Sequence, residues 1–297
     1  MQPLAIGIDL GCTHIKGVLL DGSGKILDEI KADTHEQDDT QWKNSIANIV
    51  RDFKKNAPYP VKAIGLSAPG LANTGNTCIS FMPSRLPGLE NFVWSDWIGD
   101  NVFVINDAHA ALMAEAKFGS GRGLQHVLLV TLGTGVGGGL LINGQLYQGM
   151  FQMAGHIGHT TVDGESTLRD ITNMPGSIED AIGNNTLSER SHGRYTSTEA
   201  LIADFRNGDH FAAWVWLTSV RKLAVCIASA INLLSPEAVI LSGGIVQAGV
   251  SLIEPLQEFL SFYEWRPGGK QTLIKIAEFT DRAGAIGAAG FAISKMK

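Results

Sequence analysis

The sequence contains two similar glycine-rich segments, Ile8–Gly22 and Val130–Gly144. In both segments a Leu-Gly pair, a later glycine, an apolar triplet and an Asp-Gly or Asn-Gly dipeptide occupy matching positions. Each segment predicts an apolar strand, a turn of small residues, a second strand and a turn dipeptide favoured in type I′ hairpins. Such a repeat indicates two similar domains facing one another. The alternative is a pair of unrelated glycine-rich hairpins.

The turns of the two hairpins are built from small residues, so their backbone N–H groups can approach a phosphate closely. Asp9, near the end of the first strand, is placed to hold Mg²⁺ directly or through water. Lys16 either reaches a phosphate or is an ordinary surface lysine. These features predict a nucleotide clamped between two domains. The candidate phosphate-binding turn residues are Gly11, Cys12, Thr13, Thr134 and Gly135.

The composition fits a folded protein with many tight turns. At 297 residues the chain can form two domains with substantial cores. Its 35 glycines exceed the average share of about 7%, but 44% of the residues are hydrophobic, which argues against disorder. The net charge of −6 argues against a nucleic-acid partner, because nucleic-acid binding needs a basic face.

The cysteines and the N-terminal segment predict a soluble cytoplasmic protein. Three scattered cysteines are typical of a reducing compartment and do not form a disulfide framework. The first residues lack the basic region of a signal peptide and lead directly into a strand. The longest apolar helix expected, around 223–234, is too short to span a bilayer. We therefore expect no membrane partner.

Strands alternate with helices along the chain, which predicts an α/β architecture. We expect the domain boundary near residues 107–108, with one domain at 1–107 plus a closing helix at about 284–297, and the other at 108–283. Besides the hairpins, strands are expected at 25–30, 61–67, 102–105, 238–241 and 273–277. Helices are expected at 41–55, 108–118, 198–205, 211–234, 252–262 and 283–297, and 149–185 is expected to be irregular.

Asn106 and Asp107 directly follow the apolar strand expected at 102–105. A carboxylate at such a strand end faces the cleft of an open α/β sheet. There Asp107 can take a proton from an attacking hydroxyl, a role that contributes about 10²–10⁴ in rate. Asn106 can hydrogen-bond the same substrate. The alternative role for Asp107 is the N-cap of the next helix, and the two roles are compatible.

Two further glycine-rich segments are weaker signals. Gly243 and Gly244 follow the strand expected at 238–241, where they would let a flat base approach the backbone. The Gly/Ala pattern at 283–290 favours tight packing of the closing helix over a ligand site.

Six motifs occur in a fixed order: Asp-x-Gly-x-Thr, Ala-Pro-Gly, Asn-Asp-Ala, Leu-Gly-Thr-Gly-x-Gly-Gly-Gly, Gly-x-x-Gly-His and Ser-Gly-Gly. This order resembles the ROK family (repressor, open reading frame, kinase) of sugar kinases over nearly the whole chain. The resemblance implies an actin-like, ribonuclease-H-like fold with ATP and a sugar in the interdomain cleft, and a homodimer. Repressor members carry an additional helix-turn-helix domain, which we do not expect here because the chain begins at its first strand.

The resemblance also implies roles for individual residues. Asp107 would be the catalytic base, and Mg²⁺ would be held by Asp9 and Asp107. The implied nucleotide-binding residues are Asp9, Gly11, Cys12, Thr13, Lys16, Thr134, Gly135, Gly243 and Gly244. The implied sugar-binding residues are Gly70, Arg85, Asn106, Asp107, His156, His159 and Glu179.

The sequence departs from the family pattern on the sugar side. Family members usually have a glutamate at the position of His156, and three zinc-binding cysteines where this chain has Asp170, Thr172 and Ser177. Structural zinc needs four good ligands, commonly thiolates with histidine, so we expect no zinc. His159 and Glu179 keep their implied contacts with the sugar. The alternative is that His156 points away from the sugar and Glu179 takes over.

A second departure is Arg85, which stands where the family often has a sugar-binding asparagine, although a one-residue shift would put Ser84 there. In the family, the position of Arg85 is often a neutral asparagine and the position of His156 is usually an acidic glutamate. This chain has a basic group at the first position and a titratable group at the second. We therefore expect an anionic or unusually substituted sugar, and we expect plain glucose to be a poor substrate.

The sequence as a whole predicts an ATP-dependent sugar kinase that transfers the γ-phosphate to a hydroxyl of a hexose or hexose derivative, with Asp107 as general base. The alternative is a catalytically weak sugar- or nucleotide-binding protein derived from such a kinase. A chaperone-like actin-fold ATPase is more remote, because the chain is short for one.

Overall fold

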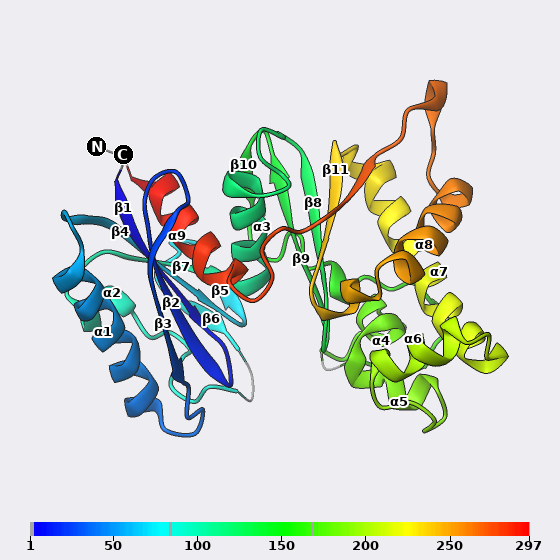
Figure 1. Ribbon diagram of the computed structural model, residues 1–297, viewed down its shortest axis with the longest axis horizontal. Coiled ribbons are helices and arrows are strands. Elements are labelled where there is room, and N and C mark those ends of the chain that lie inside the picture. The colour runs from blue at the N-terminus through cyan, green and yellow to red at the C-terminus, as the bar shows by residue number, and fades with distance from the viewer. Residues whose placement is uncertain (1–2, 83–84, 168, 171, 297) are drawn as a thin grey trace. The chain divides into compact units, whose positions relative to one another are not determined.

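The computed structural model describes residues 3–82, 85–167, 169–170 and 172–296, and its strands form two five-stranded sheets with the same internal order (Figure 1). The first sheet has the order β3-β2-β1-β4-β7 and the second β10-β9-β8-β11-β12. In each sheet the first strand of a hairpin pairs in parallel with a strand from much later in the chain. This shared order confirms the internal repeat and argues against two unrelated hairpins. The strands are β1 (Leu4–Leu10), β2 (His14–Leu20), β3 (Ile26–Asp33), β4 (Val61–Ala68), β7 (Val102–Asn106), β8 (Val127–Leu132), β9 (Val136–Ile142), β10 (Gln145–Tyr147), β11 (Ala238–Ser242) and β12 (Leu273–Ile276).

The chain divides into two compact units that differ from the predicted domains. Helix α3 (Asp107–Phe118) falls in the first unit, although it was expected to open the second domain. It packs there against α9 (Ala283–Lys295), because Gly287 lets the two helix backbones meet and any Cβ at Gly287 would collide with the Ala110 carbonyl. Unit 1 comprises Met1–Leu124, Leu140–Ala154 and Ala277–Lys297, and unit 2 comprises Gln125–Gly139 and Gly155–Ile276.

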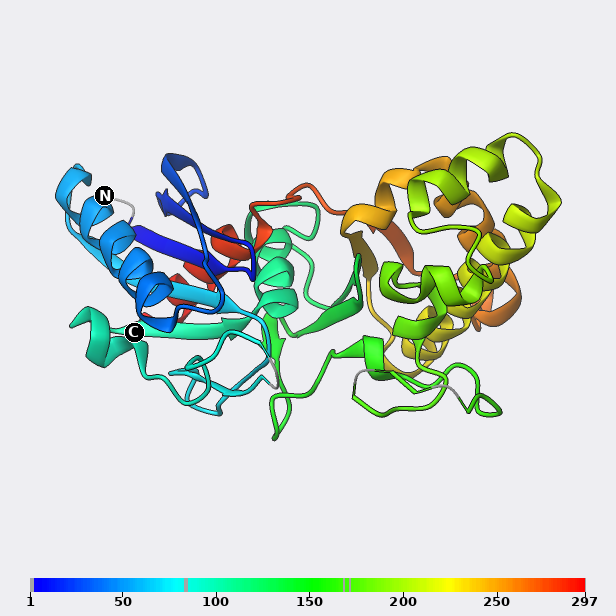
Figure 2. The same cartoon turned by 90° about the horizontal axis from the view of Figure 1, so that it is seen from below.

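In unit 1, helices cover both faces of the sheet. Helix α1 (Asp39–Asn56) lies on one face and α9 on the other (Figures 1 and 2). The strands pass very close to α9 at two glycines, Gly7 and Gly65. A Cβ at Gly7 would collide with the Ala285 carbonyl, and one at Gly65 with the Ala288 carbonyl. The packing role predicted for the closing helix is therefore confirmed.

Helix α1 begins and ends where its sequence directs. Asp38 is the N-cap, and its Oδ1 accepts a hydrogen bond from the Gln41 N–H at 2.9 Å. Lys54 and Lys55 lie in the last turn, where cations interact favourably with the helix dipole. The apolar face predicted from helical spacing is buried in the unit 1 core, and it consists of Trp42, Ile46, Ile49, Val50 and Phe53.

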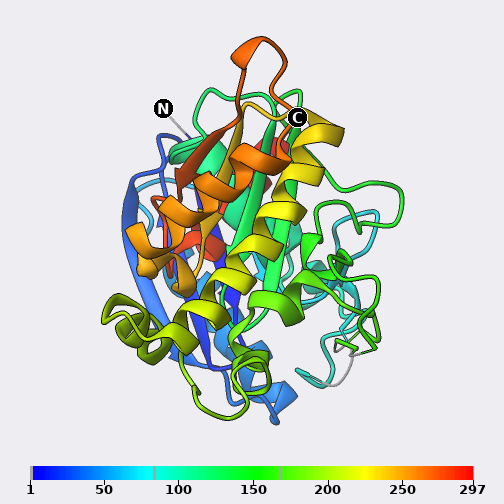
Figure 3. The same ribbon diagram turned by 90° about the vertical axis from the view of Figure 1, so that its right-hand side faces the viewer.

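In unit 2, α7 (His210–Leu234) and α8 (Val250–Tyr263) lie side by side over the sheet (Figure 3). Among the described residues, α7 is the one helix that is long and apolar enough to cross a membrane by length and composition. The helix predicted at 211–234 is confirmed, but the expectation that the longest apolar helix, around 223–234, is too short to span a bilayer was wrong. Buried side chains recur along α7 from Ala212 to Ile231, as in the core helix of a folded domain.

Among its described residues, the segment expected to be irregular, 149–185, contains only short helices, η1 (Ile157–His159) and α4 (Ile178–Ile182), besides part of η2. Both η1 and α4 carry residues that the sequence predicts to bind sugar. The other elements are β5 (Leu71–Ala72), β6 (Ile79–Phe81), α2 (Trp94–Ile98), η2 (Asn184–Thr186), α5 (Leu187–Arg190), α6 (Thr198–Arg206), η3 (Gly244–Ala248) and η4 (Pro267–Gly269).

Candidate functional site

Three parallel strands of unit 1 bring Asp9 and Asp107 to one edge of the sheet. Asp9 of β1 is in register with Ser67 of β4, and Ser67 is in register with Ile105 of β7. The carboxyl ends of these strands therefore lie together, which is where ligands bind in open α/β sheets. Asp107 directly follows β7, and its charge acts on Asp9.

Asp9 occupies a confined position. The Ser67 hydroxyl donates to Asp9 Oδ1 at 2.9 Å. Any Cβ at Gly284 would collide with the Asp9 carboxylate, so the start of α9 closely approaches that group. Burial, together with the nearby Asp107 charge, raises the pKa of Asp9 to about 6, although the Ser67 hydrogen bond lowers it. The charged form of Asp9 therefore favours a cation partner.

The N-cap of α3 is Asn106, so the alternative that assigned the cap to Asp107 was wrong. Asn106 Oδ1 accepts from the N–H groups of Ala108 and His109 at 2.9 and 3.2 Å. Its Nδ2 donates to the Gly70 carbonyl at 2.9 Å. The Asn106 side chain therefore fixes the helix start and ties it to the turn after β4.

Asp107 presents its carboxylate at the first turn of α3. One oxygen accepts from the Ala108 N–H at 2.8 Å, and the residue remains exposed to solvent. Desolvation by the surrounding protein raises the pKa of the Asp107 carboxylate, although hydrogen bonds from Ala108 and Asn106 oppose the rise. Such a carboxylate is open to a substrate and is a stronger base than an ordinary aspartate.

The two cations that the sequence assigns to this side of the chain are both paired within unit 1. Lys16 Nζ donates to the Asp281 carbonyl at 2.7 Å and lies 3.4 Å from Asp281 Oδ2. Arg85 forms a bidentate salt bridge with Glu36, in which Nε donates at 3.0 Å and Nη2 donates at 3.1 Å. The positive charge that Arg85 was expected to add is thus neutralised locally. Ser84 lies outside the described residues.

The turn of the first hairpin is held by neighbouring backbone. The Gly11 N–H donates to the His14 carbonyl at 3.0 Å, and the Thr34 hydroxyl donates to the Gly11 carbonyl at 2.6 Å. Thr34 N–H also donates to the Thr13 carbonyl at 3.0 Å. Thr13 is exposed and Cys12 is half-buried, where burial raises the pKa of its thiol. The turn is therefore fixed in shape before any ligand binds.

The turn of the second hairpin is joined to two short helices of unit 2. Glu179 of α4 accepts from the Val136 N–H through Oε2 at 2.9 Å. A Cβ at Gly135 would collide with the same Glu179 oxygen, and a Cβ at Gly158 of η1 would collide with the Val136 carbonyl. Sequence reasoning missed this contact between Glu179 and the turn, because the residues lie far apart in the chain. Thr134, at the tip of the turn, is exposed.

The two glycines after β11 differ in what they do. Gly243 has a φ of +96°, and any Cβ there would collide with the Leu132 carbonyl at the end of β8. It is therefore required by the fold itself. Gly244 has open space where a Cβ would be, and both glycines are exposed to solvent.

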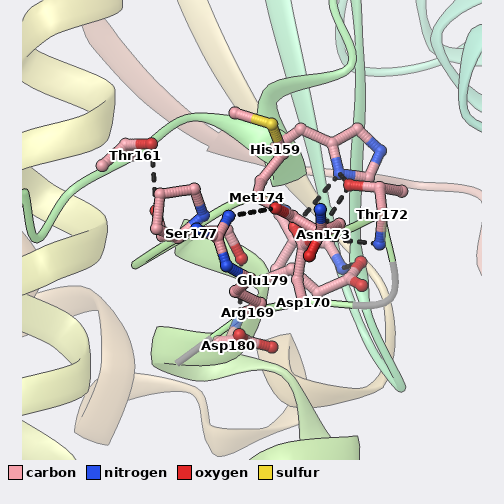
Figure 4. Close-up of polar contacts among 12 residues, drawn as sticks. His159, Thr161, Arg169, Asp170, Thr172, Asn173, Met174, Ser177, Glu179 and Asp180 are labelled. Carbon is pink, nitrogen blue, oxygen red and sulfur yellow. Dashed lines mark hydrogen bonds and ion pairs between the residues drawn. The ribbon is translucent and has the colours of Figure 1, made fainter. Parts of the chain in front are cut away.

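His159 and the three positions that replace cysteines form one polar cluster (Figure 4). His159 Nδ1 lies 3.4 Å from Asp170 Oδ2 and 3.2 Å from Thr172 Oγ1. A zinc ion does not fit this donor set, since only one imidazole and one carboxylate accompany two hydroxyls. Within the described part of the chain, no group of three or more His, Cys, Asp or Glu side chains is placed to hold a metal ion.

Each unit brings its own share of the predicted site residues together. His156, the remaining sugar-side residue, directly precedes η1 in unit 2 and is half-buried. Unit 1 holds Asp9, Gly11, Cys12, Thr13, Lys16, Gly70, Arg85, Asn106 and Asp107. Unit 2 holds Thr134, Gly135, His156, His159, Glu179, Gly243 and Gly244.

Comparisons with known proteins agree over the full length of the chain. Residues 5–295 match the ROK family. A glucokinase from Thermotoga maritima is 31% identical over 278 residues, which cover 85% of this chain and 86% of the relative.

Solved structures show the same fold. A ROK hexokinase from Thermus thermophilus superposes with a TM-score of 0.89 at 26% identity, covering 98% of each chain. A ROK family glucokinase from Streptomyces griseus, in complex with glucose and AMPPNP, has a TM-score of 0.79 at 25% identity and covers 98% of this chain and 99% of its own. The expected α/β fold with two actin-like domains is confirmed.

Proposed function

Because the chain belongs to the ROK family, we propose that it is an ATP-dependent sugar kinase acting on a hydroxyl of a hexose or hexose derivative. The observation that carries the proposal is Asp107, an accessible carboxylate with a raised pKa at the carboxyl edge of the parallel strands. The glucokinase relative and the AMPPNP and glucose complex of a similar structure support the reaction type.

Asp107 would act as the general base. Its carboxylate would accept the proton of the sugar hydroxyl as that oxygen attacks the γ-phosphate of ATP. Desolvation raises the pKa of Asp107, which strengthens its carboxylate as a base. Asn106 contributes by capping α3, which fixes the backbone from which the Asp107 side chain projects.

Mg²⁺ fits the pair Asp9 and Asp107. One or two carboxylates, completed by water and substrate phosphates, are the usual protein share of a magnesium site. The raised pKa of Asp9 and the repulsion from Asp107 are what a bound cation would relieve. When bound, Mg²⁺ would neutralise charge on the phosphates. The nucleotide itself would meet the backbone N–H groups of the two hairpin turns, with Gly244 accessible for the adenosine.

The sugar would be bound by Asn106 and Gly70 in unit 1 and by His159 and Glu179 in unit 2. Arg85 no longer supports an anionic sugar, because Glu36 neutralises its charge. His156, in place of a glutamate, remains the reason to expect plain glucose to be a poor substrate. A neutral imidazole accepts one hydrogen bond, whereas a carboxylate accepts several.

A coupled ADP-release assay across a panel of sugars tests the proposal, with Asp107→Asn as the decisive variant. We expect turnover to fall at least about 100-fold while the Kd for ATP changes little. A loss smaller than about tenfold would show that Asp107 is not the base. If none of the sugars in the panel causes ADP release, but calorimetry shows that the protein still binds a sugar or a nucleotide, the alternative of a weakly catalytic binding protein is favoured. The homodimer and the cytoplasmic location stay predictions.

A further inference from the structure

A single buried carboxylate, that of Asp170, lies at the centre of the cluster around His159 (Figure 4). Its Oδ1 accepts from the Thr172 N–H at 2.8 Å, the Thr172 hydroxyl at 2.7 Å and the Met174 N–H at 2.9 Å. Three donors on one oxygen stabilise the charged form, and these hydrogen bonds lower the pKa of Asp170 although burial opposes them.

The same carboxylate reaches three separate segments of unit 2. Its Oδ2 lies 3.4 Å from His159 Nδ1 in η1, and the Ser177 side chain is close enough to help lower the pKa of Asp170. The Ser177 hydroxyl is the N-cap of α4, where it accepts from the Asp180 N–H at 3.2 Å. Asp170 therefore joins η1, the loop around Thr172 and the start of α4.

The polarity of this cluster is the reverse of that in a metal site. A zinc ion is a cation surrounded by lone-pair donors, typically thiolates and an imidazole. Here an anion lies at the centre, and hydroxyl and N–H groups surround it. All three positions implied to hold cysteines take part in this reversal, since Asp170 provides the anion and both Thr172 and Ser177 provide hydroxyls.

The hydrogen bonds also fix which nitrogen of His159 carries the proton. The Thr172 hydroxyl has one proton and donates it to Asp170, so its oxygen can only accept from His159 Nδ1. Asp170 Oδ2, the other neighbour of Nδ1, also only accepts. His159 therefore carries its proton on Nδ1 when neutral, and Nε2 is left as an acceptor. A metal ion bound at Nδ1 would leave Nε2 as a donor instead.

We propose that Asp170 is a positioning residue that takes the place of a metal ion, holds Thr172 and Met174 in place and presents His159 Nε2 to the sugar as a hydrogen-bond acceptor. The proposal rests on the proposed sugar kinase function for its consequence, namely that His159 Nε2 accepts a hydrogen bond from a sugar hydroxyl. The cluster also helps to position Glu179, because Ser177 is the N-cap of α4, the helix that carries Glu179. Glu179 in turn accepts a hydrogen bond from the Val136 N–H of the second hairpin.

The first test measures the His159 tautomer directly. Long-range ¹H–¹⁵N correlation spectra of protein labelled with ¹⁵N-histidine distinguish the tautomers, and His159→Gln assigns the signal. We expect the Nδ1–H tautomer in the unsubstituted protein and a mixture in Asp170→Asn and Thr172→Val. Thr172→Ser keeps the hydroxyl and should restore the Nδ1–H form. An Nε2–H tautomer in the unsubstituted protein would overturn the proposal.

The second test asks whether the four positions converge as a metal cluster would. The triple variant D170C/T172C/S177C supplies three thiolates beside His159. We expect this variant to bind about one equivalent of zinc by elemental analysis and to give the absorption of tetrahedral thiolate coordination with Co²⁺. Absence of zinc and Co²⁺ binding would mean that the side chains do not surround a common centre, and the proposal would fail.

The third test separates positioning from general stability by kinetics. Asp170→Asn should raise the sugar KM at least about tenfold while the ATP KM stays within about threefold. Glu165→Gln removes the same charge from an exposed position of the same loop, and it should leave both constants within about twofold. Equal changes in both KM values would indicate a structural role only and would overturn the proposal. If the unsubstituted protein phosphorylates no sugar, the proposed function fails, and the tautomer and metal tests still decide the role of Asp170.

Discussion

Replacing Asp9 by Asn should stabilise the protein in the absence of nucleotide and divalent cations. The pKa of Asp9 rises from 3.8 to about 6 on folding, mainly through burial. A rise of this size corresponds to about 3 kcal/mol by which the folded state disfavours the charged carboxylate. Because Asp9 is only half-buried, this figure is an upper bound, and we expect a gain of about 1–3 kcal/mol for Asp9→Asn.

The gain should depend on pH in a defined direction. Between about pH 4 and pH 6 the folded state keeps a proton on Asp9 that the unfolded state releases, so stability falls as the pH rises through this window. Above pH 6 the full cost is present, and below pH 4 it disappears. Asp9→Asn should therefore be more stable than the unsubstituted protein at pH 8 and nearly equal to it at pH 4.

Thermal unfolding followed by circular dichroism in EDTA checks this expectation. For a domain of this size about 2 kcal/mol shifts Tm by about 4–8 °C. Asp52→Asn, at an exposed position on α1, is the matched control and should shift Tm little at either pH. A lower Tm for Asp9→Asn at pH 8, or an equal gain at pH 4 and pH 8, would refute the reasoning. Saturating Mg-ATP should then stabilise the unsubstituted protein more than the variant.

Three further outcomes are expected. Protein purified without added zinc should contain well under one equivalent and keep its Tm in EDTA; a stoichiometric, tightly held zinc ion would contradict the Asp170-centred cluster. Gly7→Ala should lower the stability of unit 1 by about 2–4 kcal/mol because its Cβ meets the Ala285 carbonyl, whereas Gly164→Ala, with open space and no positive φ, should be nearly neutral by urea unfolding. Glucose should be used with a kcat/KM below about 10⁴ M⁻¹s⁻¹; a value within the ordinary range of about 10⁴–10⁸ M⁻¹s⁻¹ would show that His156 does not weaken glucose binding.

Local patterns predicted the elements well wherever one stretch of sequence decides the structure. The helical spacing of Trp42, Ile46 and Phe53 predicts α1, because the residues of one buried helix face recur at regular intervals in the sequence. The short apolar run before Asn106 predicts the buried strand β7. The bounds of α7 were predicted to within one residue, but its apolar character was expected to be confined to about 223–234, whereas apolar residues extend over most of the helix.

Contacts between distant segments could not be predicted in the same way. The Glu179 bond to Val136 N–H and the Arg85 pair with Glu36 join residues that share no local pattern. Asp107 was the alternative candidate for the cap of α3, but Asn106 provides the cap. Both residue types cap helices, and only the backbone decides between them. The missing zinc-binding cysteines are visible in the sequence, but the hydrogen-bonded cluster that stands in their place could not be predicted from it.

The packing of α9 onto the first sheet has a consequence for the order in which the protein can be made. Gly7 and Gly65 are synthesised before any residue of unit 2, yet the helix that covers them, α9, is synthesised after all of unit 2. Until α9 emerges from the ribosome, the sheet face that it covers has no partner from this helix. During translation, unit 1 therefore stays incomplete while the whole of unit 2 is made, and its apolar sheet face is the surface that a chaperone would have to shield.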